Sequence, residues 1–122
     1  MDNPICWFEL PVVELERATR FYETVLGIDL RRESCGGHPM AIFPYTEPQP
    51  SGALVQMPQL APRDNGTLVY LNGGEDLNLA LGRVAAAGGE VVMEKTDIGK
   101  DIGHFALFID SEGNRVGLYS KY

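Results

Sequence analysis

The sequence predicts an α+β fold made of two similar modules, each with a strand, a helix and three further strands (βαβββ). Three observations support this prediction. An apolar strand leads into an amphipathic helix, the same unit recurs 62 residues later, and short segments separated by turn residues follow each helix. A chain of 122 residues has the length of one domain and is long enough to bury a core. We therefore expect one domain over residues 1–122, with modules at about 1–60 and 66–122.

The first module begins with an apolar strand at residues 5–10, which ends at Pro11 because proline cannot donate a ladder hydrogen bond. A helix follows and ends at Gly27, since glycine enters the left-handed conformation without a steric cost. Its buried face is predicted by apolar residues at spacings of three, four and seven: Leu15, Ala18, Phe21, Tyr22, Val25 and Leu26. Three strands are then expected at residues 30–34, 40–43 and 53–57.

The second module repeats this helix face and its glycine stop. Leu77 corresponds to Leu15, Ala80 to Ala18, Val84 to Tyr22 and Gly89 to Gly27. Asp76 or Asn72 is expected to cap the second helix. Strands are expected at residues 67–71, 90–94, 104–109 and 115–120, and residues 95–103 are expected to form a long polar loop.

The charge balance argues against several classes of partner. The chain has 17 acidic and 10 basic residues, a net charge of −7, whereas nucleic acids and anionic membrane surfaces require basic patches. No apolar run approaches the ~20 residues of a membrane span, and the first residues, MDNPIC, lack the parts of a signal peptide. We therefore expect a cytoplasmic protein. Cys6 is expected to be a small core residue, because free cysteine is among the most buried residue types.

Two motifs carry a resemblance to a known family. Residues 9–27, ELPVVELERATRFYETVLG, and residues 105–120, FALFIDSEGNRVGLYS, are similar to the first strand-helix unit and the closing hairpin of the vicinal oxygen chelate superfamily. This is also called the glyoxalase/bleomycin-resistance/dioxygenase superfamily. The start of the chain most resembles a subgroup of small uncharacterised proteins described as related to lactoylglutathione lyase. The resemblance implies an incomplete barrel around a cavity, and a homodimer.

The resemblance also identifies the positions at which a metal would be held. Metal enzymes of this superfamily bind a divalent ion through His, Glu or Gln side chains on the first and last strands of each module. The corresponding residues here are Trp7, Val69, Gly117 and either Val55 or Gln56. Only Gln56 among them has a side chain that can bind a metal, and a site needs about three protein ligands. We therefore expect no metal at these positions and no cofactor.

The first functional hypothesis is a protein that binds a small molecule in the central cavity without the usual metal. Gly117 would leave room where a metal ligand normally stands, and apolar walls with a few polar groups suit small ligands. The residues expected to line the cavity are Trp7, Glu9, Phe43, Gln56, Val69, His104, Gly117 and Tyr119. Alternation along the first strand places Trp7 and Glu9 on one face.

The alternative is a glyoxalase- or dioxygenase-like enzyme, a lyase, isomerase or oxygenase. It would need a divalent metal held by non-standard ligands, such as the two histidines with Glu9 or Glu112, or Glu9 as a metal-free general base. Glu9 is therefore the candidate catalytic residue, and its structural interpretation is a solvated residue at the end of a strand. Likewise, His104 either reaches the mouth of the cavity or has a structural role.

Overall fold

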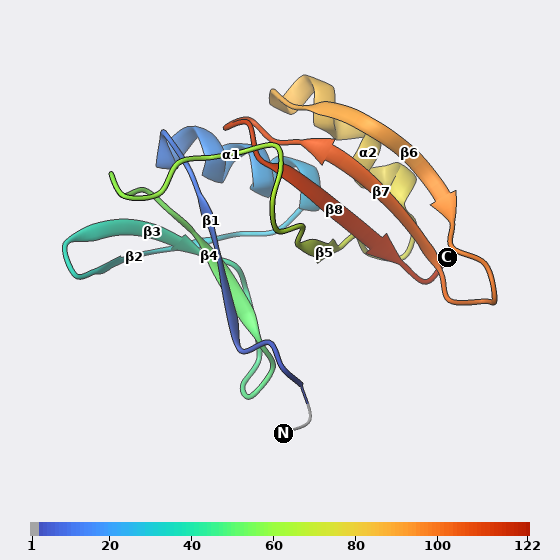
Figure 1. The fold of residues 1–122 in the computed structure, drawn as a ribbon, viewed down its shortest axis with the longest axis horizontal. Coiled ribbons are helices and arrows are strands. Elements are labelled where there is room, and N and C mark those ends of the chain that lie inside the picture. The colour runs from blue at the N-terminus through green and yellow to red at the C-terminus, as the bar shows by residue number, and fades with distance from the viewer. Residues whose placement is uncertain (1–2) are drawn as a thin grey trace.

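The computed structural model describes residues 3–122 as two helices and two four-stranded sheets (Figure 1). The elements of module 1 are β1 (Trp7–Pro11), α1 (Leu15–Leu26), β2 (Arg31–Cys35), β3 (His38–Ile42) and β4 (Ser51–Val55). Those of module 2 are β5 (Tyr70–Asn72), α2 (Leu77–Ala87), β6 (Glu90–Asp97), β7 (His104–Ile109) and β8 (Arg115–Ser120). The predicted βαβββ order therefore occurs twice.

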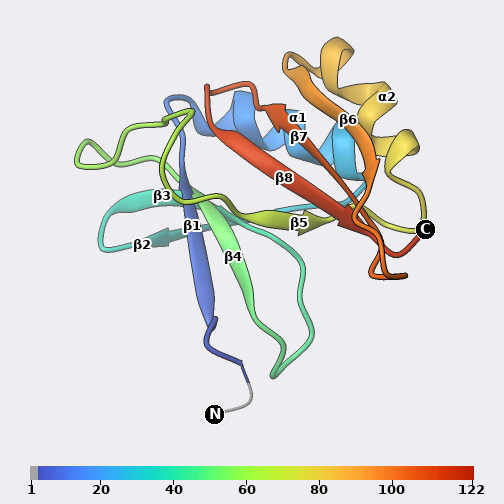
Figure 2. The same ribbon diagram turned by 45° about the vertical axis from the view of Figure 1, so that its right-hand side comes forward.

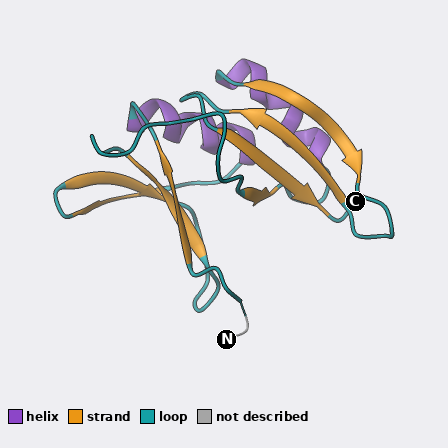
Figure 3. Cartoon of the chain, in the orientation of Figure 1, coloured by secondary structure: helices purple, strands orange, loops and turns teal. Residues whose placement is uncertain are grey.

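The two sheets have the same internal order, as expected for a repeated unit. Sheet A runs β1-β4-β3-β2 and sheet B runs β5-β8-β7-β6, and in each the first strand is parallel to the last while the other pairs are antiparallel. No strand pairing joins the two sheets within residues 3–122, so the barrel is incomplete. Both helices lie on the same side of the molecule, and the sheets spread away from them (Figures 2 and 3).

Each sheet therefore has a face that packs against the helices and a second face, which we call the open face. Phe8 and Leu10 of β1 pack into the core, so the alternating residues Trp7 and Glu9 belong to the open face of sheet A. Leu71 of β5 packs into the core in the same way. By the same alternation, Tyr70 of β5 belongs to the open face of sheet B.

One core joins both modules. Phe21 and Tyr22 of α1 and Phe108 of β7 are almost fully buried, and the ring centroids of Phe21 and Phe108 are 5.7 Å apart. The same cluster contains Leu54 of sheet A and Leu118 of sheet B. Because a half-chain would expose this surface, neither module buries a comparable core alone.

The start of α1 is held by residues far away in the sequence. Glu14, the residue before the helix, makes no capping bond with its own side chain. Instead, the N–H groups of Val13 and Glu14 each donate to Oε1 of Glu112 at 2.9 Å, and the N–H of Leu15 donates to Oε1 of Gln56 at 2.7 Å. These bonds satisfy donors that a helix start otherwise leaves unpaired. The turn between β7 and β8 and the residue after β4 thus fix the position of α1.

The turn Asp-Ser-Glu-Gly-Asn between β7 and β8, which contains Glu112, makes further contacts with module 1. The Tyr22 hydroxyl donates to Oδ2 of Asp110 at 2.6 Å, and burial together with the Asp110 carboxylate holds the pKa of Tyr22 well above its ordinary value. The Asn114 side-chain amide donates to the carbonyl of Pro11 at 2.8 Å. The motif that resembles the superfamily's closing hairpin therefore connects the two modules.

Both helices end as predicted, at glycines in the left-handed conformation. Gly27 has φ 67° and its N–H donates to the carbonyl of Glu23. The second helix ends at Gly88, with φ 108°, next to the Gly89 that the repeat aligns with Gly27, and the N–H of Gly89 donates to the carbonyl of Val84. The capping prediction is confirmed for Asp76, whose side chain accepts from the N–H of Asn78 at 3.0 Å.

Some boundaries differ from the expected ones. Strand β6 continues to Asp97, into the segment that was expected to be a loop, because residues 96 and 97 still pair with β7. Strand β5 is limited to three residues. The prediction for Cys6 is wrong, since β1 begins only at Trp7 and Cys6 lies exposed beyond the sheet. Neither helix of residues 3–122 has the length and apolar character needed to cross a membrane.

Candidate functional site

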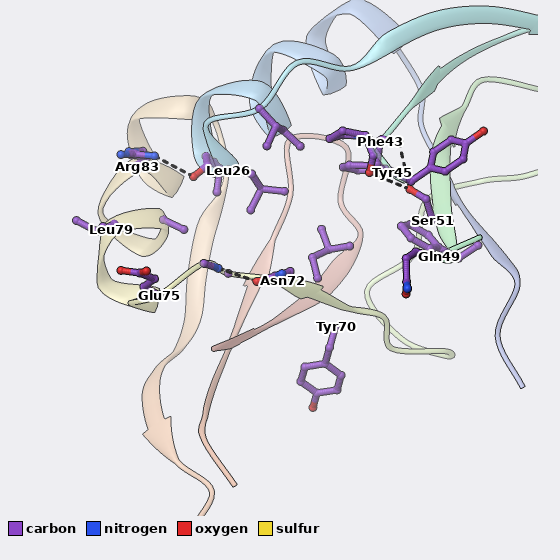
Figure 4. A pocket seen from close by; sticks show the side chains of 18 of the residues that line it. Leu26, Phe43, Tyr45, Gln49, Ser51, Tyr70, Asn72, Glu75, Leu79 and Arg83 are labelled. Carbon is purple, nitrogen blue, oxygen red and sulfur yellow. Dashed lines mark hydrogen bonds between the residues drawn. The ribbon is translucent and has the colours of Figure 1, made fainter. Parts of the chain in front are cut away.

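A cavity of about 670 Å³ lies between the two modules, and we call it the inter-module cavity (Figure 4). From module 1, its lining comes from β1, the end of α1, the segment after β3 and the start of β4. From module 2, it comes from β5, from residues 72–76 and from α2. Its volume falls within the range of about 300–1,000 Å³ that small-molecule sites usually have.

The module 1 side of the inter-module cavity is mainly aromatic. The rings of Phe8 and Phe43 lie 5.7 Å apart, and the ring of Phe43 also meets that of Tyr22 at 5.6 Å. Tyr45 lines the same side and packs edge-on against Trp7 at 6.3 Å. Nearby, the Ser51 hydroxyl donates to the carbonyl of Phe43 at 3.2 Å. This wall suits a flat apolar group, because aromatic pairs favour edge-on and tilted contacts.

The module 2 side carries the charged groups. Leu79 and Arg83 are four residues apart and form one stripe along α2, while Glu75 lies two residues before the helix, and all three line the cavity (Figure 4). Asp76 also lines the cavity, and its carboxylate is 2.9 Å from Nζ of Lys95. The backbone hydrogen bond from Asn78 and the side-chain bond from Lys95 hold the pKa of Asp76 below its ordinary value. Asp76 is thus an ionised cap.

Among the residues predicted for the site, Trp7 and Glu9 lie together on the open face of sheet A. Trp7 is 39 % exposed, and its Nε1 donates to Oε2 of Glu9 at 3.3 Å. Glu9 is exposed and lies opposite Ala53 on β4. Neither residue belongs to the lining of the inter-module cavity. A role for them in ligand binding stays a prediction.

The surroundings of Gly117 differ from the expected ones. A Cβ atom on Gly117 would lie 2.4 Å from a ring carbon of Tyr70, so this ring fills the space that the glycine was expected to leave. Val69 packs against the shared core, and its carbonyl accepts the N–H of Gly117 at 2.9 Å. Val69 thus lies on the core side of the chain, and the open-face residue of β5 is its neighbour Tyr70. A role for Val69 in ligand binding stays a prediction.

The other predicted residues lie in separate places. Phe43 is buried and lines the inter-module cavity. Gln56 is engaged at the start of α1, as described above. His104 is half-buried at the start of β7, on the side of Ala106 and Phe108 that faces α2, and its Nδ1 has no hydrogen-bond partner among residues 3–122. The Tyr119 hydroxyl donates to the carbonyl of Ile102 at 2.6 Å.

The residues present do not fit the metal site of the superfamily. The side chain of Gln56, the one ligating group at the expected positions, is bonded to the backbone of α1, and the ring of Tyr70 covers Gly117. Across residues 3–122, no three His, Cys, Asp or Glu side chains are grouped so that they would hold a metal ion.

Several lining residues were not expected from the sequence, above all Tyr70, Leu79 and Arg83. A signal existed for Tyr70, since alternation about Leu71 places it on the face opposite the core. The stripe of α2 was also detectable from the spacing of four residues. Nothing in the sequence indicated that the end of α1 lies opposite this stripe, because that depends on how the modules pack.

Comparison with known proteins places the chain in a family. A family model described as "Glyoxalase/Bleomycin resistance protein/Dioxygenase superfamily" matches residues 5–118. The chain belongs to this superfamily. It is 27 % identical over 125 residues to a glyoxylase-like domain-containing protein from Didymella fabae, and the match covers 99 % of this chain and 96 % of that protein.

Solved structures of the superfamily share the fold. A crystallised variant of glyoxalase I from Zea mays has a TM-score of 0.74 and 22 % identity, and the match covers 98 % of this chain and 47 % of the maize chain. This chain thus spans about half the length of that enzyme. A glyoxylase/bleomycin resistance protein/dioxygenase domain from Frankia sp. EAN1pec has a TM-score of 0.72 and 15 % identity, with 98 % of each chain covered.

Proposed function

We propose that this protein binds a small, largely apolar molecule in the inter-module cavity, without a metal ion at the superfamily's usual positions. The observation that carries this proposal is a cavity of about 670 Å³ with an aromatic wall on its module 1 side and charged groups on its module 2 side. Such a lining is typical of ligand pockets, in which apolar contacts supply affinity and a few polar groups orient the ligand. Membership of the superfamily supports the proposal, but it names no ligand.

A ligand screen with a blocked cavity tests the proposal. Small neutral aromatic compounds are titrated against the protein by calorimetry and by amide shifts in nuclear magnetic resonance spectra. Leu79 lines the cavity and is 64 % exposed, so Leu79→Trp adds a bulky group at the cavity without disturbing the core. We expect this variant to lose most of its affinity for compounds that bind the wild type.

The matched control is Leu60→Trp, the same substitution at an exposed leucine outside the inter-module cavity. It should bind as the wild type does. Compounds that bind both variants equally well would place the ligand elsewhere and refute the proposal, as would a screen without any hit. Elemental analysis of untagged protein tests the proposal that no metal is bound. A stoichiometric divalent ion would favour the enzyme hypothesis instead.

We further propose that the protein is a homodimer in which the open faces of the sheets are covered by a second copy. Apolar side chains are exposed on both edge strands of sheet B, where Tyr70 of β5 is 50 % and Met93 of β6 is 41 % exposed, and exposed apolar surface can mark contacts between proteins. Light scattering should then give a mass of twice 13.4 kDa. Met93→Glu should shift the mass to the monomer, whereas Val13→Glu, at an exposed valine outside the strands, should not.

A further inference from the structure

The lining of the inter-module cavity contains one cation. Arg83 of α2 is the single positively charged side chain among the described residues of the lining. It lies at the opposite end of the cavity from Tyr45 (Figure 4). A ligand that spans the cavity would therefore meet a guanidinium at one end and aromatic rings at the other.

Most of the hydrogen-bonding capacity of Arg83 is unused. Its Nη1 donates to the carbonyl of Val25 at 3.4 Å, which is a long bond near the end of α1. A guanidinium carries five N–H donors in a planar fork, so most of them are left for another acceptor. No carboxylate of residues 3–122 approaches the guanidinium within 4.0 Å, in contrast to Arg17 and Arg32, which form ion pairs at 2.7 Å.

The surroundings of Arg83 favour pairing with an anion. Arg83 is exposed. The nearby lining residues Leu26 and Leu79 (Figure 4), like Ile28 elsewhere in the lining, offer no polar side-chain atoms. A ligand seated against these side chains would exclude water from the guanidinium. Attraction between opposite charges is stronger where water is excluded, because the local dielectric constant is lower than in bulk solvent. A carboxylate that is buried against Arg83 would therefore gain more binding free energy from this attraction than a carboxylate at an open surface.

The same lining disfavours ligands with more than one negative charge. Glu75 and Asp76 also line the cavity, and only Asp76 is paired with a lysine. The protein as a whole has a net charge of −7. One cation beside two carboxylates suits a single negative charge on the ligand and repels a phosphate dianion.

From these observations we infer that the inter-module cavity selects monocarboxylates with an apolar, aromatic body. The carboxylate binds the guanidinium of Arg83, where the planar fork matches two carboxylate oxygens. The body passes Leu26 and Ile28 and contacts the rings of Phe43 and Tyr45. This inference rests on the proposed binding function and adds the class of ligand to it.

The experiment compares an acid with its neutral amide of the same shape. Binding of 3-phenylpropanoate and of 3-phenylpropanamide is measured by calorimetry at neutral pH and constant ionic strength. We expect the wild type to bind the acid at least about tenfold more tightly, because hydrogen bonds with charged partners are about twice as strong as neutral ones. Arg83→Gln should lower the affinity for the acid to that for the amide, while Arg83→Lys should retain part of the preference.

The control is Arg20→Gln, at an exposed arginine of α1 that does not line the inter-module cavity, and it should keep the full preference for the acid. Equal affinity of acid and amide in the wild type, or a preference that survives in Arg83→Gln, would overturn the inference. So would the absence of binding by either compound, or inorganic phosphate that competes with the acid. The neutral compounds and Leu79→Trp test whether the cavity binds ligands at all, whereas Arg83→Gln tests whether it selects acids. Failure of one proposal can therefore be distinguished from failure of the other.

Discussion

At the scale of single residues, Gly117 and Tyr70 show how a missing side chain decides local packing. The ring of Tyr70 occupies the volume that a side chain at Gly117 would need. The sequence identified Gly117 as the position without a metal-binding side chain. It did not identify what takes that volume, because the occupant comes from a parallel neighbouring strand 47 residues earlier (117 − 70 = 47).

A double-mutant cycle tests this packing. Gly117→Ala should lower the free energy of unfolding by about 1–3 kcal/mol, since overpacking forces the Tyr70 ring to move. In a Tyr70→Ala background the same change should cost much less, because the clashing ring is absent. Urea unfolding of the four proteins measures the coupling, and Tyr45→Ala, at another exposed tyrosine, is the control background. Additive effects within about 0.5 kcal/mol would show that the two residues are independent.

At the scale of elements, one glycine within helix α2 and one just after it have opposite roles. Gly82 lies on its exposed side, and a Cβ there would have no atom within 4 Å. At Gly89, just after the helix, a Cβ would lie 2.5 Å from the carbonyl oxygen of Ile109 and 2.7 Å from the ring of Phe21. The first glycine only weakens the helix, whereas the second allows the chain to pass close to β7.

We therefore expect substitution by alanine to stabilise the protein at Gly82 and to destabilise it at Gly89. Gly82→Ala should raise the free energy of unfolding by about 0.5–1 kcal/mol, the usual difference in helix propensity. Gly89→Ala should lower it by about 1–3 kcal/mol, because neither a backbone carbonyl nor a buried ring yields easily. Thermal and urea unfolding measure both changes. A destabilised Gly82→Ala variant would mean that this side of α2 is covered by something else.

At the scale of the whole molecule, Glu112 connects the modules. Its side chain is buried, and it accepts hydrogen bonds from Arg17 at 2.7 and 2.9 Å as well as from the start of α1. Burial alone raises the pKa of this carboxyl. The bonds from Arg17, Ser111 and the backbone of residues 13 and 14 outweigh that effect and lower the pKa to about 2.

This carboxyl should make the stability of the fold depend on pH. The pKa of Glu112 in the folded protein is about 2, below its ordinary value of 4.5, so its stabilisation is fully present above pH 4.5. It is lost as the pH falls from 4.5 towards 2. The full contribution is on the order of 3 kcal/mol, since one unit of pKa corresponds to about 1.4 kcal/mol.

Glu112→Gln measures this contribution. At pH 7 we expect the variant to be less stable than the wild type by about 2–3 kcal/mol, because the charge-assisted bonds are lost. The difference in free energy of unfolding between the variant and the wild type should decrease as the pH is lowered to 3. Glu33→Gln is the control, at an exposed carboxylate that pairs with Arg31 at 3.4 Å, and it should have little effect at either pH. A gap that stays constant with pH would contradict the role assigned to Glu112.

Much of the fold followed from local patterns. The helix faces, the glycine stops and the ends of β7 and β8 were predicted because hydrophobic period and turn chemistry act within a few residues. The boundary of β6 was missed, since pairing with β7 outweighs the polar composition of its last residues. Cys6 was misplaced because its apolar neighbours do not reveal where the sheet ends.

The candidate site, in contrast, depends mainly on tertiary packing. The sequence was sufficient to identify the superfamily, because its motifs depend on which residue stands at a given place. Only the tertiary structure brings the end of α1, the aromatic segment after β3 and the stripe of α2 around one cavity. Contacts such as Gln56 with α1 or Tyr70 with Gly117 join residues from different elements. Such contacts depend on how the elements pack, and packing leaves no periodic signal in the chain.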